Sequence, residues 1–292
     1  MRWSFFADGT QQRSLVRLSR LLFAGLILAA SAPADSADPL PMPPLAAAER
    51  GAYRARDLQS GEELWQAEWT LSQESQEGRP VLYLREDGKD IARRWGRTAW
   101  SHEMRLDLWG THPVLNSTDE SRDASGRAVR VQEREFDYAT GEGRLVTKEP
   151  LKGTEDSRAV AVRPQAITPE LVPAVLRLLP ESRYHQMRFD VITPDGRTIG
   201  MRARILGRER VTVPAGRYDC FKVELEPTGI VGFLAAFKLA KIFMWQTVAA
   251  PHFWVKYEGP EGSTGSRQIV RELTRFESEV AAAPVGPSPP AS

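Results

Sequence analysis

The sequence has a single cysteine, Cys220, among its 292 residues. One cysteine cannot form a disulfide within the chain, so stability must come from the burial of apolar side chains. Strand parity places Cys220 on the face opposite Phe221 and Val223, and no histidine lies near it in the sequence to activate the thiol. We therefore interpret Cys220 as a small buried or half-buried residue rather than a nucleophile.

The chain also lacks an excess of charge of either sign. It contains 39 Lys and Arg residues against 38 Asp and Glu residues, a formal net charge of +1. In proteins that bind nucleic acid, an excess of Lys and Arg displaces counterions from the phosphate backbone. This composition has no such excess of basic residues. Nucleic acid is therefore excluded as the expected partner.

Motifs that carry catalysis or bind cofactors are missing as well. The sequence has no G-x-S-x-G elbow, no H-E-x-x-H, no phosphate-binding loop and no dinucleotide-binding glycine pattern. Its four histidines lack metal-ligand spacing, and His102 and Glu103 would face opposite sides of a strand. The acidic pairs Glu62–Glu63 and Asp119–Glu120 are interpreted as residues on solvent-exposed faces. We expect no enzyme activity, no cofactor and no metal.

The N-terminus is typical of a secretory signal peptide over residues 1–34. Arginines precede the short apolar run Leu21–Ala30, and Ala32 and Ala34 offer two alternative cleavage sites. The run is too short to span a membrane as a helix. We expect an exported protein, in the periplasm of a Gram-negative bacterium. Beyond the signal peptide, composition predicts a Pro-rich linker over 35–47, a folded domain over 48–279 and a disordered tail over 280–292.

Alternation of apolar and polar residues dominates the predicted domain. Trp65–Leu71 has the period of a half-buried strand, and Val81–Leu84 reads as a second strand that ends in a turn at Glu86–Gly88. Two alternating runs flank Pro194–Gly196 and predict a hairpin. Many strands with few helices indicate a mostly β fold, a curved antiparallel sheet or half-open barrel, in which two half-sheets could meet near 164–180.

Two short helices complete the prediction. Thr168–Leu179 has an N-cap residue followed by proline at its first position. The apolar stretch Thr228–Thr247 allows either an amphipathic helix that covers the open end of the sheet, or a helix over Ile230–Leu239 followed by a strand over Lys241–Thr247. We favour the second. A spanning helix would bury two lysines near its centre, so no transmembrane span is expected.

Three segments together resemble a known family. They are REFDYATGEGRL (Arg134–Leu145), MRFDVITPDGRTIGMRARILGRERVTVPAGRYDCFKVEL (Met187–Leu225) and WQTVAAPHFWVKYEG (Trp245–Gly259). The pattern of strands and turns resembles the exported bacterial proteins grouped as DUF3108, a domain of unknown function, and their TapB-like relatives. This resemblance implies a periplasmic curved sheet, similar to half-open barrels that carry lipoproteins or lipids. It brings no catalytic residues.

Three functions remain open. The first is a non-enzymatic carrier that binds lipid or another apolar ligand in a largely apolar cavity of the concave sheet. The second is a structural or assembly factor of the cell envelope that meets an envelope protein through an exposed apolar patch. The third, which we disfavour, is an enzyme such as a hydrolase that uses Cys220. For the carrier, the candidate cavity or lid residues are Trp65, Trp69, Phe233, Phe237, Met244 and Trp245.

Overall fold

The computed structural model describes residues 46, 48–76, 79–92, 97–107, 114–164, 166–182, 185–228, 241–261 and 267–279. The predicted signal peptide, the tail, the helix over Ile230–Leu239 and all of the linker except Ala46 lie outside these residues.

Strands make up most of the described chain. They are β1 (Ala48–Asp57), β2 (Glu63–Gln76), β3 (Arg79–Asp90), β4 (Ala99–Asp107), β5 (Val114–Arg122), β6 (Ala128–Asp137), β7 (Glu142–Glu149), β8 (Thr154–Ala161), β9 (Ala166–Ile167), β10 (Gln186–Ile192), β11 (Thr198–Val213), β12 (Gly216–Pro227), β13 (Ile242–Thr247), β14 (Trp254–Pro260) and β15 (Gln268–Glu279).

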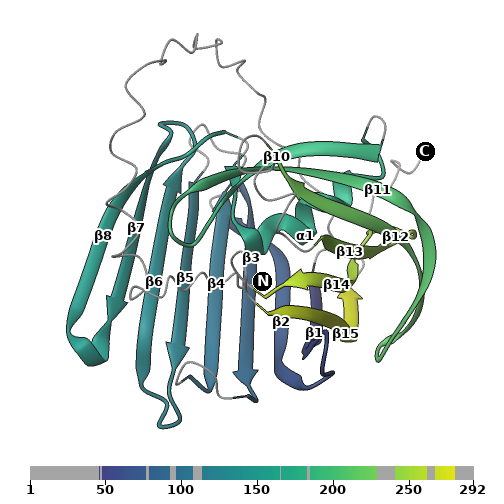
Figure 1. The fold of residues 1–292 in the computed structure, drawn as a ribbon. Helices are drawn as coiled ribbons and strands as arrows, with labels where there is room; N and C mark the ends of the chain where they lie inside the picture. The colour runs from purple at the N-terminus through teal and green to yellow at the C-terminus, as the bar shows by residue number, and fades with distance from the viewer. Residues whose placement is uncertain are drawn as a thin grey trace, which may run out of the picture.

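All fifteen strands form one sheet in the order β8-β7-β6-β5-β4-β3-β2-β1-β15-β14-β13-β12-β11-β10-β9. Every neighbouring pair is antiparallel except the short β9 beside β10. The chain passes from the last residue of β8 to the first of β9, at the opposite end of the sheet, over five positions, which span at most about 18 Å. The sheet must therefore curl strongly, as Figure 1 shows. The predicted fold class is confirmed: a mostly β protein with one large open sheet that does not close into a barrel.

The period-two pattern gave the correct strands where it was strong. Trp65–Leu71 lies within β2, and β10 and β11 form the predicted hairpin around Pro194–Gly196. Side chains alternate between a buried concave face and a more polar convex face, as in β4, where Trp100, His102 and Met104 are buried. This alternation is expected of a sheet with one face packed on the core.

The predicted turn at Glu86–Gly88 is wrong, because β3 continues to Asp90. A Cβ atom on Gly88 would lie 2.1 Å from Cζ2 of Trp100 on the neighbouring strand. The indole of Trp100 is buried and contacts Trp65 edge-on at 5.5 Å, so it has little room to move. Gly88 therefore marks a close approach of backbone and indole inside a strand rather than a chain reversal.

The predicted helix over Thr168–Leu179 is present in place but not as one regular helix. It consists of the 3-10 turn η3 (Pro169–Leu171), the single α-helical turn α1 (Val172–Val175) and the 3-10 turn η4 (Leu176–Leu178). Pro173 has no backbone N–H to donate, which prevents regular i to i−4 bonding. Thr168 does not cap the first turn with its side chain; its hydroxyl lies 3.7 Å from the sulfur of Met104.

The second half of the apolar stretch follows the favoured interpretation. Residues 242–247 form β13, between β12 and β14. Among the residues that the structure describes, none forms a helix long and apolar enough to cross a membrane.

Candidate functional site on the concave face

Residues 166–179 pack against the concave face of the sheet, and we call them the covering segment (Figure 1). The side chains of Leu171, Val175 and Leu179 are buried in the core. Arg177 donates hydrogen bonds of 2.7 and 2.6 Å to the two carboxylate oxygens of Glu49 on β1. The amide of Gln246 on β13 donates to the carbonyl oxygen of Leu176 at 3.0 Å. The covering segment is therefore fixed to the sheet by polar bonds as well as by apolar contact.

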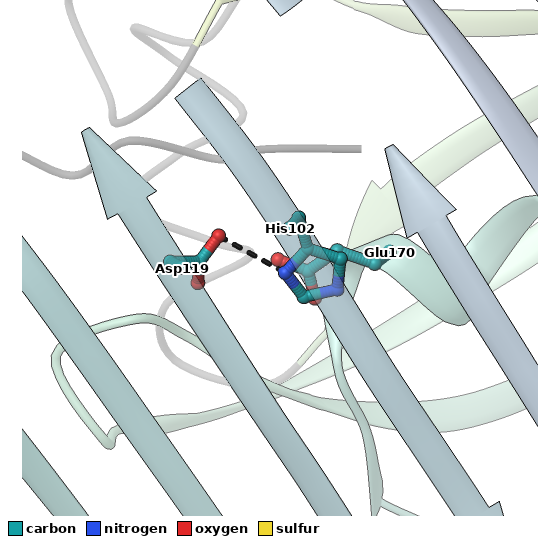
Figure 2. Close-up of side chains that lie close together, drawn as sticks. All are labelled: His102, Asp119 and Glu170. Atoms are coloured by element: carbon teal, nitrogen blue, oxygen red, sulfur yellow. Dashed lines mark hydrogen bonds and ion pairs between the residues drawn. The ribbon is translucent and has the colours of Figure 1, made fainter. Parts of the chain in front are cut away.

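A second set of buried charges fixes the start of this segment. His102 on β4 and Asp119 on β5 are joined by a hydrogen bond of 3.0 Å between Nδ1 and Oδ1 (Figure 2). Arg134 on β6 donates to Asp119 and, at 3.2 Å, to both carboxylate oxygens of Glu170 in η3. Burial lowers the pKa of Arg134, but the carboxylates of Glu170 and Asp119 outweigh it, so the net shift is upward. We call these four residues the charged cluster.

The interpretation of Asp119 as a solvated residue is wrong, because it is only 2% exposed. Asp119 lies directly opposite His102 in the antiparallel register, and alternation in β5 turns it to the concave face while Glu120 turns outward. Its partners lie 17 and 15 residues away in sequence, so only the strand register brings the charges together. The opposite facing of His102 and Glu103 is as predicted.

His102, Asp119 and Glu170 offer ligand atoms that all lie within 4.8 Å of one another, as a metal centre would require. However, the guanidinium of Arg134 donates to both carboxylates and already supplies the positive charge between them. Among the described residues, Nε2 of His102 has no hydrogen-bond partner. The arrangement fits an ion-pair network that holds the covering segment to the sheet better than it fits a metal site.

The two candidate tryptophans of β2 lie on the concave face as core side chains. Trp69 stacks on Tyr53 with 6.0 Å between ring centroids, and Nε1 of Trp65 donates to Glu261 at 3.0 Å. Both indoles are buried. They are partners of other side chains rather than free walls of a large opening.

Sequence reasoning missed the cation beside these rings. The guanidinium carbon of Arg271 on β15 lies 4.5 Å from the ring centroid of Trp65 and 4.7 Å from that of Trp254. A terminal nitrogen also lies 3.5 Å from Glu86 on β3. Aromatic faces stabilise a buried cation when a carboxylate is also near. The only sequence signal for this buried cation is the alternation of apolar and polar residues in β15, which places Arg271 on the buried face of the strand.

Two further candidates that the structure describes lie on opposite faces of β13 (Ile242–Thr247). Both side chains are buried, and Met244 faces the concave side while its neighbour Trp245 faces the convex side. There the ring of Trp245 is flanked by the ammonium groups of Lys222 and Lys256 at 5.1 and 4.7 Å. Its Nε1 donates to Glu209. The other two candidates, Phe233 and Phe237, lie outside the described residues.

A cavity of about 50 Å³ remains between the covering segment and the sheet. It is lined from the sheet by residues that include Trp69 and Glu86, and from the covering segment by residues that include Glu170 and Arg177. This volume suits a few water molecules, whereas sites for small ligands occupy about 300–1,000 Å³. The carrier site suggested by the sequence stays a prediction.

Cys220 is buried in β12, as expected. Burial, together with the charges of Asp219 and Glu209, raises the pKa of its thiol to about 12. The thiolate is the reactive form, so at pH 8 the native protein should react with a chromogenic disulfide reagent far more slowly than the urea-unfolded protein. Absorbance measures both rates. Comparable rates for native and unfolded chains would contradict this prediction.

Comparison with known proteins gives a family match for the central part of the chain. Residues 119–258 match the model described as "Protein of unknown function (DUF3108)". No curated protein matches the chain.

Solved structures with low sequence identity are similar to this chain. A Bacteroides fragilis protein described as exported, with a YmcC-like fold, is 11% identical, covers 82% of this chain and 100% of its own, and has a TM-score of 0.33. A protein of Parabacteroides distasonis described as a lipoprotein is 12% identical, with the same coverage and a TM-score of 0.30. Immune modulator A of Aeromonas veronii is 11% identical, covers 81% of this chain and 96% of its own, and has a TM-score of 0.16.

The family match includes the segments Arg134–Leu145 and Met187–Leu225, on which the resemblance in sequence rests. The resemblance to the DUF3108 family that the sequence predicted is therefore confirmed over residues 119–258.

Proposed function

We propose that this protein is a non-enzymatic, exported assembly factor of the cell envelope. It would bind an extended segment of a partner protein by adding that segment as a strand to the free edge of its sheet. The occupied concave face supports a role carried by the outside of the molecule rather than by a ligand cavity. The observation that carries the proposal is the outer edge of β8, whose backbone has no hydrogen-bond partner beyond β7 among the described residues, although the side chain of Arg158 donates to the carbonyl oxygen of Asp195 at 3.1 Å.

β8 is the outermost strand at one end of the sheet (Figure 1). All its residues except Val160 are exposed, and within the described part of the chain no hydrogen bond links its backbone to anything beyond β7. Leu151, which is 54% exposed, lies in the 3-10 turn η2 (Pro150–Lys152) just before this strand. Unpaired edges of this kind are templates for strand addition.

The register shows which backbone groups are available. N–H of Val162 donates to the carbonyl oxygen of Gly141 at 2.9 Å, and these residues continue the pairing of β7 with β8. In an antiparallel pair, hydrogen-bonded and non-hydrogen-bonded positions alternate. The N–H and C=O groups of Glu155, Ser157, Ala159 and Ala161 therefore point away from β7. The charges at Glu155, Asp156 and Arg158 oppose unselective pairing and favour a partner of matching sequence.

Ala159→Pro tests the proposal because it removes one outward N–H and leaves the bonds to β7 in place. A photo-crosslinking residue at position 161, in protein purified from the periplasm, should give a defined adduct with an envelope protein. We expect Ala159→Pro to reduce that adduct by about tenfold, since several adjacent strand bonds would fail together. Mass spectrometry identifies the adduct and measures its yield.

Ala159→Val is the matched control, because it keeps the outward N–H and should keep the adduct. A crosslinker at the exposed position Thr212 on β11 should give no such adduct. The proposal fails if Ala159→Pro and Ala159→Val behave alike. It also fails if native mass spectrometry finds a reproducibly bound lipid and no protein partner, because that result would favour the carrier.

A further inference from the structure

The convex face of the sheet has a hollow of about 290 Å³ over β3 to β7. Its origin is the size of the side chains. β5 presents the short residues Asn116 and Thr118 to this face, while the neighbouring strands present longer ones such as Arg105 and Glu135. Tyr83 on β3 stands at one side of the hollow.

The polar side chains on the floor of the hollow are exposed and have no partner among the described side chains of this face. At its margin Glu103 accepts from Arg85 at 2.6 Å, and Glu133 accepts from Lys148 at 2.7 Å. Among the residues that the structure describes, the side chains of Asn116, Thr118 and Glu135 have no hydrogen-bond or ion-pair partner, although they are neighbours on the same face. Asn116 and Glu135 are directly opposite each other in the register.

Arg144 forms the far side of the hollow. It lies opposite Glu135 in the register of β6 and β7, and its Nε donates to the hydroxyl of Ser157 at 3.2 Å. The hollow thus contains an amide, a hydroxyl and a carboxylate that are free to bond, next to a guanidinium that is already held in place.

We propose that this hollow binds a neutral saccharide. The free groups include both donors and acceptors, which vicinal hydroxyl groups satisfy together. Carboxylates and guanidinium groups both line the hollow, so an anion or a cation would meet repulsion as well as attraction. An acyl chain would leave these polar groups unpaired, at a cost for each. The ring of Tyr83 offers an apolar surface on which the C–H face of a sugar can pack.

The experiment titrates the full exported chain with cellobiose, maltose and N,N′-diacetylchitobiose. Each disaccharide is added up to about 10 mM, so that a Kd in the millimolar range can be detected. Saturation-transfer NMR detects the contact, and calorimetry measures Kd. We expect one or more of these disaccharides to bind, and Asn116→Ala and Glu135→Ala each to raise Kd about tenfold. Thr212→Ala, an exposed threonine on the distant β11, should leave Kd unchanged.

Circular dichroism of each variant separates loss of binding from loss of fold. No binding by any of the three disaccharides overturns the inference, as does binding that Asn116→Ala and Glu135→Ala leave unchanged in folded protein. Preferential binding of extended tripeptides would also overturn it, since it would assign the hollow to peptide. No residue of β8 lines the hollow, so we expect these variants to leave crosslinking at position 161 unchanged, and this test and that of the proposed function can fail independently.

Discussion

Arg134→Met should lower the free energy of unfolding by about 3–5 kcal/mol. The variant keeps most of the side-chain volume but removes the guanidinium that bridges Asp119 and Glu170. Both carboxylates would remain buried, and breaking a buried pair costs more than the pair contributes, because the remaining charge stays desolvated. Urea unfolding followed by circular dichroism measures the change.

Arg210→Met is the matched control. Arg210 pairs with Asp219 at 2.9 Å, but both side chains are more than half exposed. Exposed pairs contribute between about 0 and 1 kcal/mol, so this variant should unfold almost like the original protein. Equal effects of Arg134→Met and Arg210→Met would show that the charged cluster does not hold the structure together.

Arg177→Met is expected to have an effect of similar size, about 3–5 kcal/mol, at the other end of the covering segment. It leaves Glu49 buried on β1 without the two hydrogen bonds that it accepts from Arg177. We also expect faster hydrogen exchange of the amides in residues 168–179, since that segment would lose its bond to β1. Hydrogen exchange with mass spectrometry measures the rates.

The double variant Glu49→Gln/Arg177→Met tests the cause. If the cost arises from an unpaired buried carboxylate, neutralising Glu49 should recover part of the lost stability. A double variant no more stable than Arg177→Met would instead assign the cost to lost packing of the arginine stem.

The sequence was sufficient for the parts of the fold that follow local rules. The hairpin around Pro194–Gly196 has turn residues and alternation that agree, so its prediction succeeded. The turn predicted at Gly88 was wrong because glycine occurs both in turns and where a side chain packs closely on the backbone. Only the position of Trp100 on the next strand distinguishes the two cases. Pro173 shortened a helix that its neighbours otherwise favoured.

The charged cluster was beyond local reasoning for a different reason. His102, Asp119 and Arg134 lie on three strands, and their meeting depends on the exact register of each hairpin. A shift of one residue in any of them would turn a charge to the convex face. Glu170 then arrives from the covering segment, whose position depends on how the whole sheet curls. The unpaired floor of the hollow has the same origin, since pairing across strands decides which side chains remain free.

The pairing of β1 with β15 also has a consequence for how the protein is made. Every other pair of neighbouring strands is consecutive in the chain, so each pair can form its hydrogen bonds as soon as both strands have been synthesised. The β1–β15 contact joins residues far apart in the chain, such as Arg50 and Glu279, 229 positions away. Closing so long a loop is slow. During synthesis, one edge of β1 stays unpaired until the ribosome has made β15. A chain cut short before β15 would leave two strands in the middle of the sheet, β1 and β14, open to pairing with the wrong molecule.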